Sequence, residues 1–236
     1  MPGAEFSWWS VVPTMVGAAM SILTTLAMFS LAQWTDRKKK EADKRKEGAI
    51  IAFEGFLKLK AVSEELGNQK RQIDEAFDEA REKGDTLKSP SKFVRGFVSA
   101  ASGLQSLDAK QLVFLVKIKK AELMVDAELI VRRAQNVEAS IRKYTELRDE
   151  LQQFLSSNAE VISTGGDPRG QFGFSGKNAE LAKIKVAALD ELVLQIRAFL
   201  DKDAPESRRV ADAYLSAARQ HFGDDFPQFK LEWVDD

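Results

Sequence analysis

The chain contains no cysteine and only one histidine, His221, among its 236 residues. The absence of cysteine excludes disulfides, thiolate metal ligands and a cysteine nucleophile, and it agrees with a reducing compartment. His221 has no second histidine or cysteine with which to share a metal ion, so we interpret it as a structural residue. Proline is also rare, and the last four prolines are expected to separate helical segments: Pro90, Pro168, Pro205 and Pro227.

The chain also lacks an excess of charge of either sign. With 35 basic and 36 acidic residues its formal net charge is −1, so no overall field favours binding to nucleic acid. Charged residues make up 30% of the chain and are well mixed in sign, which is typical of helices with many surface ion pairs. We therefore expect an all-α fold and no nucleic-acid partner.

Residues 6–35 contain no charged residue at all. An apolar helix of about 20 residues is long enough to cross the ~30 Å hydrocarbon core of a bilayer, and this run is longer. Trp8 and Trp9 lie near one end and Trp34 near the other, where indole rings anchor at the lipid headgroups. The sequence predicts a single transmembrane helix over 6–35. A buried core helix fits less well, because a soluble helix of this length normally has a polar stripe.

The flanking charges predict the orientation of this helix. Residues 1–5 contain no lysine or arginine, whereas seven of the eleven residues in 36–46 are basic. Basic flanks remain on the cytoplasmic side of a membrane, so we expect residues 1–5 outside and the C-terminal domain in the cytoplasm, at a plasma or inner membrane. A cleaved signal peptide does not fit, because the basic flank follows the apolar run and the run is too long. The basic residues nearest the run are the expected membrane-interface anchors: Arg37, Lys38, Lys39 and Lys40.

Residues 36–47 have no apolar face and are predicted to form a charged juxtamembrane stalk. Within the apolar run, small and hydroxylated residues follow a 3-4-3 spacing and share one helical face: Thr14, Gly17, Ser21 and Thr24. Such a face lets two transmembrane helices approach closely, so it is a candidate for self-association or for packing against a partner helix. The alternative is that Gly, Ser and Thr are simply common in transmembrane helices.

Residues 48–222 are predicted to form a cytosolic helical domain. Apolar residues recur at helical spacing over 48–83, and a short amphipathic helix is expected over 91–105. Two more helices are expected over 178–202 and from Pro205 to about Phe222.

The longest helix is expected between 108 and 156, with Asp108 as its N-cap. Part of it repeats the spacing of a coiled-coil seam: Ala134, Val137, Ile141 and Tyr144. A helix of that length would measure ~75 Å and exceed a compact bundle. We therefore expect this seam to pair with the 48–83 helix or with another subunit.

The glycine-rich stretch 157–177 is the one long irregular segment that the sequence predicts. A phosphate-binding loop would need four residues between its glycines, followed by Lys and Ser or Thr. Here five residues separate Gly170 from Gly176, and Asn178 follows Lys177, so a connector is the better interpretation. The tail 223–236 is expected to be extended, with Phe229, Leu231 and Trp233 on one side. It either docks on its own bundle or adds to a partner.

No catalytic motif, metal-ligand cluster or cofactor-binding loop is recognisable, so we expect no enzyme activity, no cofactor, no metal and no small-molecule substrate. We predict a membrane-anchored helical scaffold or adaptor that holds a cytosolic assembly at the membrane. Its expected partners are the lipid bilayer and either further copies of itself or a membrane or cytosolic protein. The alternative is an effector that oligomerises through its transmembrane helix to perturb the bilayer. A regulator of a membrane complex is not distinguishable from the scaffold by sequence.

Overall fold

The computed structural model describes the backbone of residues 8–84, 89–94, 96–97, 103–158, 160–162, 171–173 and 176–229. Side chains are described in the same ranges except in 8–27, 160–162 and 171–173. The chain divides into two compact units, Met1–Gly48 and Ala49–Asp236.

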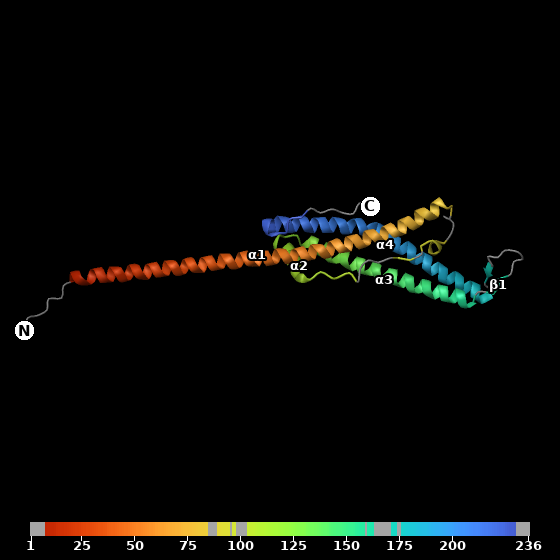
Figure 1. Cartoon of the computed structure of the whole chain (residues 1–236), viewed down its shortest axis with the longest axis horizontal. Coiled ribbons are helices and arrows are strands. Elements are labelled where there is room, and N and C mark those ends of the chain that lie inside the picture. The colour runs from red at the N-terminus through yellow and green to blue at the C-terminus, as the bar shows by residue number, and fades with distance from the viewer. Residues whose placement is uncertain are drawn as a thin grey trace, which may run out of the picture. The chain divides into compact units, whose positions relative to one another are not determined.

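The regular secondary structure of the described chain is helical apart from one small hairpin (Figure 1). Its four α-helices are α1 (Trp8–Glu82), α2 (Ala109–Lys117), α3 (Ala121–Asn158) and α4 (Gly176–Phe222). Short 3₁₀ turns occupy Pro90–Lys92 and Gly223–Asp225. Strands β1 (Glu160–Ile162) and β2 (Gln171–Gly173) pair antiparallel, with Val161 opposite Phe172. The expectation of a helical bundle is confirmed, whereas the hairpin inside the glycine-rich connector was not expected.

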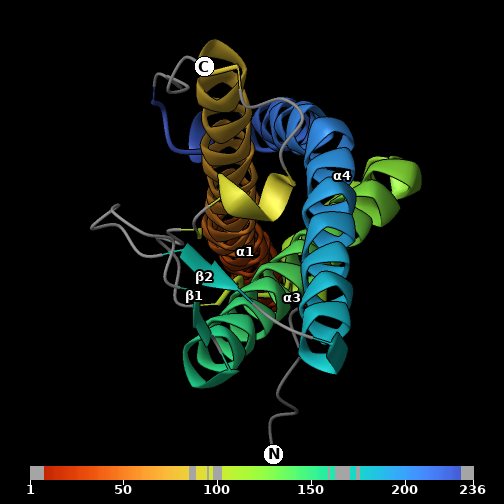
Figure 2. The same ribbon diagram turned by 90° about the vertical axis from the view of Figure 1, so that its right-hand side faces the viewer.

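The core of the second unit lies between three helices: α1 from Ala49 onward, α3 and α4 (Figure 2). The buried α1 residues Phe56, Leu59, Leu66 and Ile73 recur every three, four or seven positions, so a single face of the helix enters the core. Each fully buried side chain of this kind contributes ~1.5–3 kcal/mol. The apolar residues that recur at helical spacing in this segment are therefore the ones that pack in the core.

Two buried tyrosines tie the helices to neighbouring backbone. The Tyr144 hydroxyl donates to the Val94 carbonyl at 2.6 Å. The Tyr214 hydroxyl lies 2.6 Å from the Gln111 carbonyl and 3.1 Å from that of Ala52. α1 approaches Tyr214 so closely that a Cβ added at Gly55 would lie 2.5 Å from the hydroxyl oxygen. Only glycine fits there without displacing the ring.

The predicted single helix over 108–156 is wrong, because the chain breaks between Lys117 and Ala121. Lys119 adopts the left-handed conformation with φ 59°. The Lys120 N–H bonds to the Leu115 carbonyl and the Lys119 N–H to the Val116 carbonyl. These bonds form a Schellman C-cap, a motif that normally places glycine where Lys119 stands. At the other end of α2, Asp108 is the N-cap as expected, and its N–H bonds to Gln111 Oε1 at 3.0 Å.

The predicted break before Pro205 is also wrong, because α4 continues through this residue. Pro205 has no N–H to offer the Asp201 carbonyl, and such a loss kinks a helix or costs ~3 kcal/mol. Figure 1 shows α4 bending along its length. Leu200 before the proline and Val210 and Tyr214 after it are fully buried. This burial holds both halves in the core and outweighs the local penalty.

The short helix expected over 91–105 is not formed in the described part of that segment, which has only the 3₁₀ turn at its start. Its apolar side chains nevertheless face the core as expected. The Phe93 ring lies 4.9 Å from Phe77, and the Phe97 ring lies 5.8 Å from Tyr144. Burial here is achieved with irregular backbone that crosses the bundle.

Candidate functional site

Exposed apolar side chains mark the described part of the first unit. Met28, Phe29, Leu31 and Trp34 are between 54% and 70% exposed. Neighbouring exposed apolar side chains of this kind form a patch, a feature that in other proteins often marks a contact with lipid or with a partner. The predicted anchors and association residues earlier in the run lie outside the residues whose side chains are described: Trp8, Trp9, Thr14, Gly17, Ser21 and Thr24.

The polar groups at the end of this apolar segment are satisfied locally. The Thr35 hydroxyl lies 3.1 Å from the Leu31 carbonyl and 2.9 Å from that of Ala32, so it needs no water to pair with. The Lys38 ammonium lies 3.8 Å from the centre of the Trp34 ring, a cation–π contact. Residues 36–47 continue α1 with exposed side chains. The arrangement combines an amphipathic indole and a cation at the transition from apolar to charged residues.

Among the residues described, no helix has both the length and the apolar character needed to cross a membrane.

The second unit has a cleft of about 1030 Å³ between α1 and α4, lined by charged and small residues. We call it the α1–α4 groove, and its lining includes Ser63, Gly67, Lys70, Arg71 and Asp74 of α1 and Ala204, Pro205, Arg208 and Arg209 of α4. No described atom lies within 4 Å of a Cβ added at Gly67. The groove is therefore open where its small residues lie and charged along its walls.

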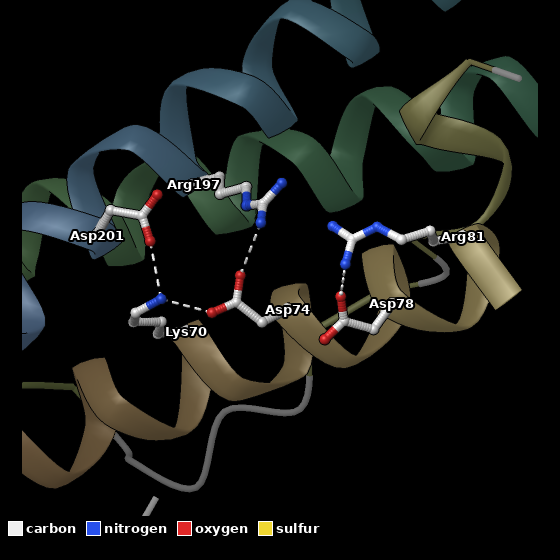
Figure 3. Close-up of polar contacts among 6 residues, drawn as sticks. All are labelled: Lys70, Asp74, Asp78, Arg81, Arg197 and Asp201. Carbon is white, nitrogen blue, oxygen red and sulfur yellow. Dashed lines mark hydrogen bonds and ion pairs between the residues drawn. The ribbon is translucent and has the colours of Figure 1, made fainter. Parts of the chain in front are cut away.

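A row of alternating charges joins the two helices at one end of this groove (Figure 3). Lys70 Nζ lies 2.8 Å from Asp201 and also pairs with Asp74, whose other oxygen lies 3.1 Å from Arg197. The hydrogen bonds to Asp201 and then Asp74 raise the pKa of Lys70. Arg197 also covers the Phe77 ring, 4.2 Å from its centre. Every cation here has a carboxylate partner, so the row fixes the position of α4 on α1 and leaves no free acid or base.

One carboxylate is buried near the bend of α4. Asp203 is 4% exposed, and Arg133 of α3 lies 3.2 Å from it. A buried carboxylate without such a partner would cost several kcal/mol. No group of three or more metal-ligating side chains occurs in the part of the chain that the structure describes.

The predicted association seam on α3 is covered by this chain itself. Ala134, Val137, Ile141 and Tyr144 are at most 5% exposed. A second subunit would have to open the bundle to reach them. Of the predicted docking tail, Phe229 is described and packs within 5.3 Å of Phe53 and 5.5 Å of Phe56 (ring centres), while Leu231 and Trp233 lie outside the described residues.

The sequence analysis did not single out the α1–α4 groove. The Lys70–Asp74 pair could have been found from its spacing of four residues. Its connection to Asp201, 131 positions away, requires the fold. Gly67 lies in the interior of α1, and the helix runs through it.

Comparison with protein-family models, curated proteins and solved structures finds no match to this chain.

Proposed function

We propose that this protein is a single-pass, membrane-anchored and non-catalytic helical scaffold, with residues 6–35 in the bilayer and the helical bundle in the cytoplasm. The observation that carries the proposal is the pattern around Trp34. Exposed apolar side chains precede it, and an exposed helical segment follows it in which every residue of 36–47 except Ala42 is charged. An indole at such a transition is typical of a membrane interface.

The uncharged run 6–35 and its basic flank support the same proposal. Basic residues close to anionic lipid contribute about 1 kcal/mol each, and seven lie within 36–46. The bundle supports a binding role more than a catalytic one, because the four charges of the row at the end of its groove are paired with one another. A scaffold needs a stable surface, which these pairs and the buried core provide.

Two arginine variants test the anchor. Met20→Arg places a charge near the middle of the run, where insertion costs about 2.5–3.5 kcal/mol. Ala42→Arg adds the same charge to the already charged stalk and serves as the control. We expect wild type and Ala42→Arg to stay in the membrane fraction after an alkaline carbonate wash, and Met20→Arg to be partly released. Release of the wild type, or equal behaviour of both variants, would overturn the anchor.

The orientation needs a separate measurement. A reporter fused after Asp236 that is active only on the far side of the membrane, such as alkaline phosphatase in bacteria, should be inactive. A fluorescent protein at the same position should be bright. An active phosphatase would place the bundle on the other side and contradict the cytoplasmic assignment.

A further inference from the structure

The α1–α4 groove is the continuation of a surface that already holds the described end of the C-terminal tail. On α1, Phe53, Phe56, Lys60, Gly67 and Asp74 are separated by three, four or seven residues, so they share one face. Phe53 and Phe56 lie under the tail, and Gly67 and Asp74 line the groove.

On α4 the spacing is of the same kind. Phe222, Arg219, Asp212 and Arg208 step by three, seven and four residues and share one face of the helix. Phe222 and Arg219 contact the tail, and Asp212 and Arg208 line the groove. Both walls of the groove therefore extend to the place where the tail is seated.

The described part of the tail runs along this surface towards the groove. Phe226 packs against Phe222 and Phe53, and three residues later Phe229 contacts Phe53 and Phe56. The Phe229 carbonyl accepts a hydrogen bond from Arg219 at 2.6 Å. From Phe226 to Phe229 the chain thus moves from Phe222 towards Arg219 on α4 and towards higher residue numbers on α1.

We propose that residues 230–236 continue along this path as an extended segment and occupy the α1–α4 groove of their own chain. Seven extended residues reach ~23 Å, whereas Gly67 lies ~16 Å beyond Phe56 along α1. Side chains alternate in an extended segment, so Leu231 and Trp233 follow Phe229 onto the groove side.

The groove fits this segment in size and charge. Trp233 would reach α1 at the level of Ser63 and Gly67, opposite Ala204, where the small side chains leave space. Asp235 and Asp236 add two side-chain carboxylates, which would reach the level of Lys70 and Arg71.

The cationic groups that face this segment already have partners, which limits the electrostatic contribution to its binding. Lys70 pairs with Asp74 and Asp201, Arg71 bonds to Asn68, and Arg209 pairs with Glu206 and Asp126. The acidic end of the tail would share these cations. Seating of Leu231 and Trp233 is therefore the main contribution in this proposal.

Disulfide trapping in the full chain tests the proposal, and the absence of native cysteine makes the measurement clean. At ~3.3 Å per residue Asp235 reaches the level of Asn68, so the test pair is Asn68→Cys with Asp235→Cys. The control pair is Lys143→Cys with Asp235→Cys, because Lys143 is exposed on α3. Both proteins are solubilised in mild detergent and oxidised briefly. Products are assigned by non-reducing electrophoresis and peptide mass.

We expect the test pair to form an intrachain disulfide at least ten times faster than the control pair. Equal rates would overturn the proposal, and an interchain disulfide would assign the groove to the tail of a second copy instead. Adding Leu231→Ser and Trp233→Ser to the test pair should reduce the rate to that of the control, with the helical circular dichroism unchanged. An undiminished rate would overturn the role of the two apolar side chains. Because the groove lies within the second unit, neither result depends on the membrane anchor.

Discussion

Replacing Gly55 by alanine tests how tightly α1 is packed in the second unit. The added methyl group would lie 2.5 Å from the Tyr214 hydroxyl, 3.0 Å from Gln111 Cβ and 3.2 Å from Tyr214 Cζ. The tyrosine ring is fully buried, and its hydroxyl is held by two carbonyls, so it moves only by losing hydrogen bonds. Overpacking of this kind costs ~1–3 kcal/mol, and each lost hydrogen bond costs about 1 kcal/mol.

An opposing effect must be subtracted from this cost. Alanine stabilises a helix interior by ~1 kcal/mol relative to glycine. Gly67→Ala in the same helix measures this term, because its methyl group meets no described side chain within 4 Å. It is made in the Leu231→Ser, Trp233→Ser background, so that the tail proposed to occupy the groove does not contribute. We expect Gly67→Ala to raise the free energy of unfolding by roughly 0.5–1 kcal/mol, and Gly55→Ala to lower it by about 1–3 kcal/mol.

Tyr214→Phe completes a double-mutant cycle. In the wild-type background it should cost about 1 kcal/mol for the lost hydroxyl bonds. In the Gly55→Ala background it removes the atom that clashes, so it should cost less than 1 kcal/mol or even stabilise. Urea unfolding followed by circular dichroism of the full chain in detergent gives all four values. Stabilisation by Gly55→Ala equal to that by Gly67→Ala, or full additivity of the cycle, would refute the close approach.

Three further predictions concern stability. Lys119→Gly should raise the urea midpoint by the equivalent of ~0.5–1 kcal/mol, because the left-handed conformation costs glycine nothing; a lower midpoint would contradict the C-cap. Arg133→Ala should cost ~1–3 kcal/mol and more than Asp203→Asn, because it leaves a buried carboxylate unpaired; equal costs would contradict this asymmetry. Burial raises the pKa values of Tyr144 and Tyr214. The stabilisation that these neutral, buried tyrosines give the folded state is complete below pH ~10 and is lost as the pH rises further. Tyrosinate absorbance should therefore appear together with unfolding. Its appearance while the protein is still folded would contradict the burial of the two rings.

The helices were predictable where one apolar face determines the structure. Leu59, Leu66 and Ile73 recur at helical spacing, and the same residues are buried. Their positions follow from the periodicity because no other conformation places them on one side. Asp108 was likewise readable as an N-cap from its residue type and position.

The ends of the helices were less predictable, because tertiary burial overrides local preferences. Pro205 normally marks a helix start, yet core residues on both sides keep α4 continuous. Lys119 carries no signal for a helix end, since the left-handed position is usually glycine. The groove could not be predicted from the sequence for a related reason. Lys70 and Asp201 are brought together only by the antiparallel packing of α1 and α4.

These corrections also change where association can be sought. The coiled-coil interpretation of Ala134, Val137, Ile141 and Tyr144 rested on a helix too long for its own bundle to cover. The Schellman C-cap at Lys119 shortens that helix, and the long α4 together with the irregular segment around Val94 and Phe97 covers its apolar side. The four seam residues that motivated a second subunit are therefore already covered within the described part of this chain. In the proposed scaffold, the apolar run that precedes the charged stalk lies in the first unit, and the α1–α4 groove lies in the second. We propose lipid as the environment of the run and residues 230–236 as the occupant of the groove. Because the two features belong to different units, variants in one unit are expected to test one proposal without the other.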